Sequence, residues 1–180
     1  PANPASADFI VDDENVVCYN PDIANRYSWG AGGVKYTKMS TSEGGRYYGK
    51  CRNSNCINIE ICSNKKNRKS LSADDTDWYF TDAELALAAE LVKHLMKTYG
   101  ISAGHVIMHH QVTGKLCPAM WTHSEAELEG WKKFQQMFMP AVESNQMFYV
   151  QVGAFSSREN AEAYLAKVKK YYPGAFIKVM

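Results

Sequence analysis

Two helices with clear start signals, placed among short strand-like segments, limit the folds available to this chain. Thr81-x-x-Glu84 forms a capping box ahead of a run with apolar residues at helical spacing. Ser124-x-x-Glu127 forms a second capping box, followed by a helix with a Leu, Trp and Phe face that ends before Pro140. Strands that alternate with helices predict an α/β architecture.

Four short segments have the residue pattern of β-strands. Phe9–Val11 and Val16–Tyr19 flank a polar turn and predict a hairpin. Residues 57–62 alternate apolar and polar side chains, so their isoleucines share one face. Residues 105–109, which follow the first helix, predict another short strand.

The end of the chain has its own strand–helix–strand pattern. After a short linker, a predicted strand at residues 148–153 precedes a helix at 157–171 and a further strand at 175–179. We therefore expect two domains, a larger one at residues 1–140 and a small βαβ unit at 147–180.

Composition and charge exclude several classes of protein. Of the 180 residues, 46% are hydrophobic and 22% are charged, which is typical of a folded globular protein. Lys and Arg number 20 and Asp and Glu 19, a net charge of +1 that argues against a nucleic-acid binder with a broad basic surface. No apolar run reaches the roughly 18 to 20 residues of a membrane span. We expect no nucleic-acid partner and no membrane span, and the oligomeric state stays open.

The five cysteines form no evident disulfide framework. Cys51 and Cys56 close a short loop and could form a bridge in an oxidising compartment, which the sequence leaves undecided. Cys18, Cys56 and Cys62 lie in or beside apolar segments, where cysteine is commonly a small buried hydrophobic residue.

The densest group of chemically versatile side chains lies near residue 110. His109 ends an expected strand, and Cys117 follows eight residues later, across a turn that Gly114 permits. A loop of this length can present an imidazole and a thiolate to one metal ion, and zinc favours this mixed ligation. Lys115 would lower a thiol pKa or stabilise an oxyanion. A hydrogen-bonded structural histidine and a buried cysteine are the alternative.

Glu60 lies in the middle of the alternating segment and is flanked by isoleucines. An unpaired buried carboxylate is costly, so Glu60 either faces solvent or lines a cleft with a partner. In a cleft it could act as the general base for a metal-bound water.

Together these segments resemble the zinc-dependent N-acetylmuramoyl-L-alanine amidases, the type shared by phage lysins and peptidoglycan recognition proteins. Residues 5–12 resemble the family's Ser-Ala-His-Tyr strand, and residues 27–32 its Trp-His-Ala-Gly loop. Residues 55–61 resemble the strand with its catalytic glutamate, and residues 106–118 its His…Thr-Gly-Lys-x-Cys-Pro signature. The resemblance implies a mixed central sheet flanked by helices.

The resemblance also implies roles for single residues. His109 and Cys117 would be zinc ligands, Glu60 the catalytic acid/base, and Lys115 a stabiliser of the oxyanion. A zinc-activated water would then cleave the amide bond between N-acetylmuramic acid and the L-alanine of the stem peptide.

A long Gly- and Tyr-rich loop at residues 20–55 is expected to be functional. By the same resemblance it would form a wall of the substrate groove. Trp29, Tyr47 and Tyr48 are then the expected substrate-binding residues, although aromatic loop residues also pack on one another.

Two departures from the family pattern concern the metal and the groove. The family's third ligand is a histidine on a strand further upstream, which this chain starts too late to contain, so we expect zinc to bind weakly or not at all. His105 lies about 13 Å from His109 along a strand at ~3.3 Å per residue and does not replace that ligand. Asp8 and Gly30 stand where the family usually has histidine, a change that would alter the groove.

The tail resembles half of a SPOR module, a peptidoglycan-binding repeat. Residues 149–156 resemble its first strand, and residues 159–163 the start of its helix. This implies peptidoglycan as the partner and a protein that is secreted or cell-wall associated, or phage-encoded and released at lysis. A small α/β decoration without a ligand is the alternative, and the residues do not distinguish an autolysin from an endolysin.

Two rival functions remain. A non-catalytic peptidoglycan-binding protein would keep the groove without complete metal ligation. A papain-like cysteine peptidase would use Cys117 and His109, but such nucleophiles normally begin a helix, and Cys117 precedes Pro118 in a turn.

Overall fold

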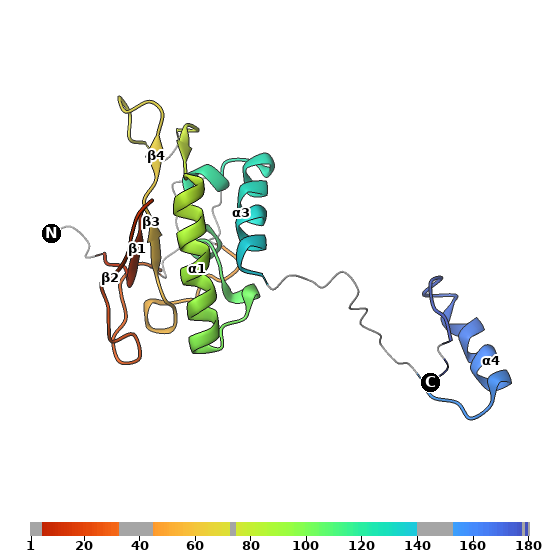
Figure 1. The fold of residues 1–180 in the computed structure, drawn as a ribbon. Helices are drawn as coiled ribbons and strands as arrows, with labels where there is room; N and C mark the ends of the chain where they lie inside the picture. The colour runs from red at the N-terminus through yellow and green to blue at the C-terminus, as the bar shows by residue number, and fades with distance from the viewer. Residues whose placement is uncertain (1–4, 33–44, 73–74, 140–152, 178, 180) are drawn as a thin grey trace. The chain divides into compact units, whose positions relative to one another are not determined.

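The computed structural model describes residues 5–32, 45–72, 75–139, 153–177 and 179. These residues divide into two compact units, Pro1–Ala141 and Val142–Met180 (Figure 1). The larger unit contains the sheet and the helices that carry the candidate site.

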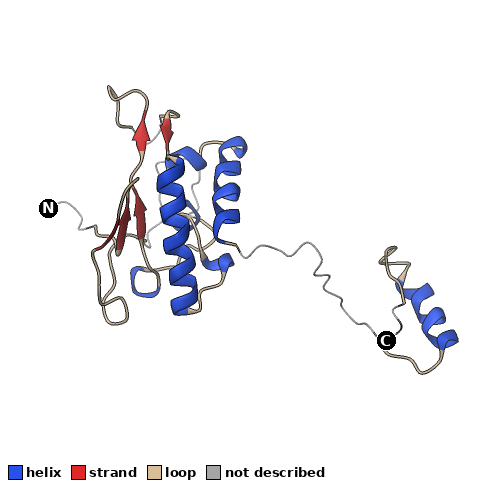
Figure 2. Ribbon diagram, viewed as in Figure 1, coloured by secondary structure: helices blue, strands red, loops and turns tan. Residues whose placement is uncertain are grey.

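A three-stranded mixed sheet forms one layer of the larger unit (Figure 2). β1 (Phe9–Val11) lies in the middle and pairs antiparallel with β2 (Val16–Cys18) and parallel with β3 (Ile59–Ile61). The predicted hairpin is confirmed, and Asp12 closes it by accepting two backbone N–H groups of the turn at 2.9 and 2.6 Å. The parallel pairing with β1 fixes the strand that carries Glu60.

The longest helix, α1 (Asp82–Tyr99), begins and ends where the sequence predicts. The Thr81 hydroxyl accepts the backbone N–H of Glu84 at 3.2 Å, and the Glu84 carboxylate accepts the N–H of Thr81 at 2.6 Å. Gly100 ends the helix with φ 66°, a left-handed conformation that glycine adopts without strain.

α1 lies between the sheet and α3 (Glu125–Phe138), and it contacts both (Figure 1). The Ser124 hydroxyl caps α3 by accepting the N–H of Glu127 at 3.3 Å. The core between these layers is rich in aromatic residues, with Trp121 stacked on Phe134 at a ring-centroid distance of 5.4 Å. Its buried members are Val11, Ala88, Ala89, Val92, Met108, Trp121, Trp131, Phe134 and Phe138.

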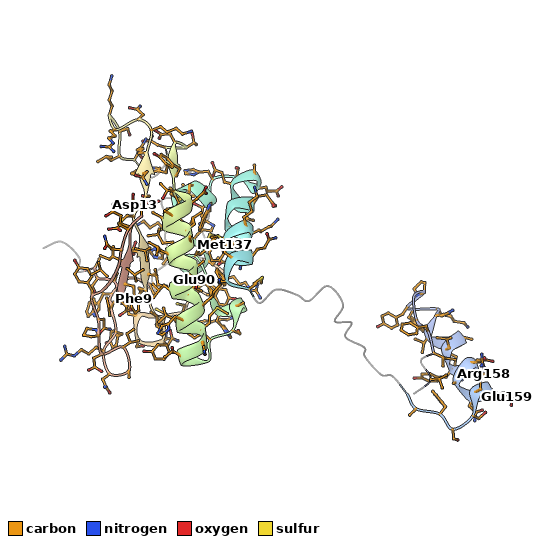
Figure 3. The ribbon with its side chains drawn as sticks, in the orientation of Figure 1. Phe9, Asp13, Glu90, Met137, Arg158 and Glu159 are labelled. Carbon is orange, nitrogen blue, oxygen red and sulfur yellow. The ribbon has the colours of Figure 1, made fainter. Side chains whose placement is uncertain are left out.

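The side chains of α1 and α3 divide between core and surface as their spacing predicts (Figure 3), whereas Cys18 and Cys62, in segments where cysteine is commonly buried, are exposed. Phe9 on β1 is 8% exposed, whereas Met137 on α3 is 38% exposed. Glu90 on α1 is exposed and pairs with Lys93 at 2.6 Å. The mixed α/β architecture expected from the sequence is confirmed.

The predicted strand at residues 105–109 is wrong. Ala103–His105 form a short 3-10 helix, η2, and His109 lies in a turn before the short helix α2 (His110–Thr113). Val106 keeps extended backbone angles, φ −85° and ψ 113°. Residues 106–108 nevertheless form no ladder with a strand of the described ranges, and an extended segment without a ladder is not a β-strand.

Residues 63–77 are rich in polar and basic side chains, yet they contain part of a second ladder. β4 (Asn64–Lys65) pairs antiparallel with β5 (Trp78–Tyr79). Lys65 is only 8% exposed, and it forms ion pairs with Asp75, at 3.0 Å, and with Asp77. The two carboxylates compensate the burial of its charge.

In the smaller unit, α4 (Arg158–Val168) forms within the helix predicted at 157–171, and the Ser157 hydroxyl caps its N-terminus. The strand expected at 148–153 falls outside the described residues except for Gly153, and residues 175–177 form no strand. None of the helices that the structure describes is both long and apolar enough to cross a membrane.

Candidate active site

One closed loop brings His109 and Cys117 to the same cavity. The backbone N–H of His110 donates to the carbonyl oxygen of Cys117 at 2.9 Å, so the two ends of the loop meet. Gly114 makes the reversal possible with φ 82°. His109 and Cys117 both line a cavity of about 910 Å³.

The residues predicted as catalytic or metal-binding all line this cavity. Glu60 reaches it from β3, and Lys115 reaches it from the loop between His109 and Cys117. The other walls include core side chains of α1 and α3, among them Val92 and Phe134. A few polar groups therefore converge in a largely apolar setting, which is typical of a ligand or active site.

Glu60 is exposed on β3 and lines the cavity. Burial of its carboxyl group among protein atoms still raises its pKa, and the positive charge of Lys115 opposes part of this increase. A carboxylate with a raised pKa is a stronger base, which suits a general base that works near neutral pH.

The surroundings of His109 keep its ring neutral. Burial lowers its pKa most, the positive charge of Lys115 lowers it further, and a hydrogen bond with the Ala31 backbone acts in the opposite direction. A neutral imidazole is the form that binds a metal, and a backbone partner on the ring fixes its orientation.

The thiol of Cys117 is not activated by its surroundings. Burial raises its pKa to about 11, and the negative charge of Glu60 adds to the increase, while Lys115 opposes it. A nucleophilic cysteine needs a lowered pKa. This environment therefore disfavours the cysteine-peptidase alternative.

As zinc ligands, His109 and Cys117 match in kind but not in number. Catalytic zinc sites use three protein ligands and an open position. In the part of the chain that the structure describes, no three His, Cys, Asp or Glu side chains gather to hold a metal ion. His105 also borders the cavity, but its Nδ1 pairs with the Ser102 hydroxyl at 2.9 Å. The described residues therefore do not by themselves form a three-ligand metal site.

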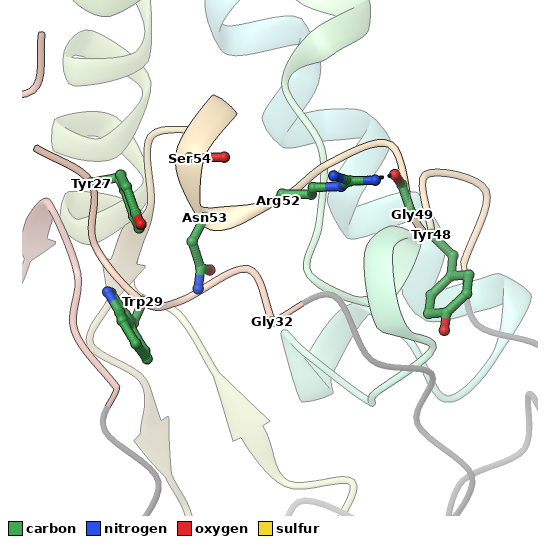
Figure 4. Close-up of a pocket in the computed structure, with 8 residues that line it drawn as sticks. All are labelled: Tyr27, Trp29, Gly32, Tyr48, Gly49, Arg52, Asn53 and Ser54. Atoms are coloured by element: carbon green, nitrogen blue, oxygen red, sulfur yellow. Dashed lines mark hydrogen bonds between the residues drawn. The ribbon is translucent and has the colours of Figure 1, made fainter. Parts of the chain in front are cut away.

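A second pocket, of about 450 Å³, contains two of the three aromatic residues expected to bind substrate (Figure 4). Trp29 and Tyr48 line it, 52% and 41% exposed. Tyr27 and Arg52 also line it, and neither was predicted as a substrate-binding residue. Tyr27 belongs to the segment that resembles the family's Trp-His-Ala-Gly loop, and this resemblance could have indicated its place in the pocket.

Tyr47 does not join Trp29 and Tyr48. It lines the larger cavity instead, and its hydroxyl donates to the carbonyl oxygen of Gly104 at 3.2 Å. The three aromatic residues therefore serve two pockets.

The two departures from the family's histidines have different structural consequences. Asp8 is 1% exposed, lines neither pocket and accepts three hydrogen bonds. The structure thus gives Asp8 a role in holding segments together and no place in a groove. Gly30 lines the larger cavity, and a Cβ there would lie 2.9 Å from Cγ of Asn58, so this close approach excludes a side chain.

Comparison with known families gives matches in both units. The sequence profile of the N-acetylmuramoyl-L-alanine amidases matches residues 2–120, and that of the SPOR domain matches residues 144–179. The first match includes every residue predicted as catalytic or metal-binding.

Individual relatives are more distant. A probable N-acetylmuramoyl-L-alanine amidase and the N-acetylmuramoyl-L-alanine amidase CwlL, both from Bacillus licheniformis, are each 32% identical over 81 residues, 45% of this chain. The aligned part is 20% and 19% of those proteins, so the chain spans about a fifth of their length. A mutant endolysin from Bacillus subtilis and the catalytic domain of XlyA are similar solved structures, each with 25% identity, a TM-score of 0.48, and coverage of 77% of this chain and 68% of theirs.

Proposed function

The chain belongs to the N-acetylmuramoyl-L-alanine amidase family, and from this we propose that its larger unit hydrolyses the amide bond between N-acetylmuramic acid and L-alanine in peptidoglycan. One observation supports this above others: Glu60, His109, Lys115 and Cys117 converge on one cavity. A base, a cation and two metal-type donors are what amide hydrolysis by activated water requires.

Glu60 moves the proton in this reaction. Its carboxylate takes a proton from the attacking water as the new C–O bond forms, and it returns that proton to the leaving nitrogen of L-alanine as the C–N bond breaks. The ammonium group of Lys115 stabilises the negative charge that develops on the carbonyl oxygen. The apolar walls of the cavity limit competing water and strengthen both interactions.

We propose that His109 and Cys117 supply two of the ligands of a zinc ion. Zinc would contribute Lewis-acid activation of the amide carbonyl and of water. Binding requires a neutral imidazole, which the lowered pKa of His109 provides, and a deprotonated Cys117, so metal loading releases a proton.

Substrate contacts are proposed for both pockets. Trp29 and Tyr48 in the smaller pocket, and Tyr47 in the larger cavity, would contact sugar or peptide. The SPOR match at residues 144–179 supports a second contact with peptidoglycan. We therefore expect action at the cell wall, by a secreted or wall-associated protein or by one released at lysis.

Hydrolysis of purified peptidoglycan with zinc in the medium tests the proposal. New α-amino groups of L-alanine should appear without new reducing sugar ends. Glu60→Gln should lower the rate by about 10²–10⁴-fold, the usual contribution of a general acid–base. Glu90→Gln, which changes an exposed carboxylate on α1, is the matched control and should leave the rate unchanged. Absence of L-alanine amino groups, or full activity of Glu60→Gln, would overturn the proposal.

A non-catalytic peptidoglycan-binding protein is the second candidate. It is favoured by the finding that, within the described residues, fewer than three metal-type side chains gather in one place. Co-sedimentation with insoluble peptidoglycan, without release of amino groups at any zinc concentration, would identify this function.

A further inference from the structure

Cys51 and Cys56 flank a turn at the edge of the larger cavity. Within it, the backbone N–H of Arg52 donates to Oδ1 of Asn55 at 2.7 Å, and the N–H of Asn55 donates to the carbonyl oxygen of Arg52 at 3.1 Å. These two bonds reverse the chain between the cysteines. Both cysteines are partly buried and free, and both line the cavity.

The two thiols are close enough for each to shift the pKa of the other. Sγ of Cys56 also lies 3.8 Å from Oδ1 of Asn58. The interaction with Cys56 lowers the pKa of Cys51 to about 7, and the interaction with Cys51 raises the pKa of Cys56. Cys51 is thus the better nucleophile of the pair at neutral pH, and Cys56 is placed to react with it next.

This turn is connected to the candidate active site. Oδ1 of Asn53 accepts the backbone N–H of Ala31 at 3.1 Å. Ala31 lines the larger cavity with His109, and its backbone raises the pKa of the His109 ring. After Cys56 the chain continues directly into the strand that carries Glu60. A covalent link across the turn would therefore restrain the wall of the cavity that contacts both His109 and Glu60.

We propose that Cys51 and Cys56 are a redox-sensitive pair that forms an intramolecular disulfide with a small-molecule disulfide as oxidant. The Cys51 thiolate attacks one sulfur of the oxidant, which forms a mixed disulfide and releases one thiol. The sulfur of Cys56 then attacks Sγ of Cys51 and releases the second thiol. The two protons of the protein thiols end on the two released thiols, the protein pair is oxidised, and the oxidant is reduced.

Mass spectrometry of the full chain tests this pairing without any assay of hydrolysis. The protein is incubated with oxidised glutathione, acid-quenched, alkylated and digested with trypsin, which cuts after Lys50 and Arg52. A Cys51–Cys56 disulfide then joins the dipeptide Cys51-Arg52 to the peptide that begins at Asn53. We expect this linked species as the main oxidised form of Cys51. A free Cys51, a persistent mixed disulfide with glutathione, or a link to another cysteine would overturn the proposal.

Two variants assign the link. Cys62 lies on the same tryptic peptide as Cys56, so Cys62→Ala is the matched control and should keep the linked species. Cys56→Ala should abolish it and leave Cys51 as a mixed disulfide. Retention of the link in Cys56→Ala, or its loss in Cys62→Ala, would refute the pairing.

The rate of alkylation gives a separate test of the contact between the thiols. At pH 7 a thiol with a pKa of about 7 has about 50 times more thiolate than one at 9.0. The lower basicity reduces its intrinsic nucleophilicity by about eightfold. Cys51 should therefore react with iodoacetamide about sixfold faster in the wild-type protein than in Cys56→Ala. Equal rates would show that Cys56 does not act on Cys51.

Discussion

Replacing Asp8 by alanine tests whether one buried carboxylate holds together the segments that form the candidate site. Oδ1 of Asp8 accepts a hydrogen bond from the side chain of Asn20 at 2.7 Å. Its Oδ2 accepts bonds from the Ser28 hydroxyl and the Asn58 backbone, both at 2.8 Å. The three donors belong to the loop after β2, to the loop that carries Trp29, and to the residue just before β3.

The expected loss of stability follows from the burial of these donors. A hydrogen bond to a charged group contributes about 1.5–3 kcal/mol when its partner stays buried. Ser28 is 4% exposed and recovers little water, so we assign its bond about 2 kcal/mol. Asn20 and Asn58 are half-buried and recover part of their hydration, so each contributes about 1 kcal/mol. Asp8→Ala should lower the free energy of unfolding by about 4 kcal/mol, a large part of the roughly 5–15 kcal/mol typical of a domain.

Urea unfolding at pH 7, followed by tryptophan fluorescence, measures this loss. Asp13→Ala is the matched control, because Asp13 is an exposed carboxylate in the neighbouring hairpin turn (Figure 3). It should change the unfolding free energy by less than about 0.5 kcal/mol. An Asp8→Ala protein within about 1 kcal/mol of wild type would refute the reasoning, since the buried donors would then not depend on the carboxylate.

Three further changes test the core, a helix cap and the proposed base. Gly130→Ala should destabilise the protein in urea, because a Cβ at this position would lie 2.4 Å from Nε1 of Trp121. Overpacking of this kind costs about 1–3 kcal/mol, which exceeds the roughly 1 kcal/mol gained in helix propensity. A variant more stable than wild type would contradict this prediction. Thr81→Ala should lower the thermal midpoint through a loss of about 1 kcal/mol in capping, and an unchanged midpoint would argue against the cap. The raised pKa of Glu60 keeps its carboxyl group protonated at a higher pH than that of an ordinary glutamate. As the pH is lowered, the rate of hydrolysis should therefore begin to fall at a pH above the range in which ordinary glutamates titrate. Lys115→Met removes a charge that lowers this pKa and should move the acid limb to higher pH; an unmoved or lowered limb would contradict the role of Glu60.

The helices and the hairpin could be predicted because their signals act within a few residues. The Thr81 cap, the Ser124 cap and the glycine at position 100 each satisfy or reverse the backbone of their own turn. The Asp12 side chain does the same for the hairpin. Such features depend little on the rest of the chain, so a reading of the sequence alone captures them.

The failure of residues 105–109 to form the predicted strand could not be foreseen in the same way. Their residue types suit a strand, and Val106 is extended, but a strand also needs a neighbour that accepts its ladder of hydrogen bonds. The buried pair of Lys65 with Asp75 and Asp77 was missed for a related reason. A lysine between polar residues predicts exposure, and only the return of the chain at β5 brings the two carboxylates to it.

The candidate site shows the same division between local and long-range information. His109 and Cys117 line the same cavity because the loop between them closes on itself, a short-range event that their spacing indicates. Tyr47 and Tyr48 are adjacent in sequence, yet the structure assigns them to different pockets. The backbone N–H of Tyr47 donates to the carbonyl oxygen of Gln111 at 2.7 Å, which holds Tyr47 against α2 and the larger cavity. The next residue then lines the other pocket. Sequence spacing therefore predicts which polar residues gather at the larger cavity better than it predicts the pockets of the aromatic residues. The polar residues share one loop and one strand, whereas the place of each aromatic side chain depends on a contact formed across the fold.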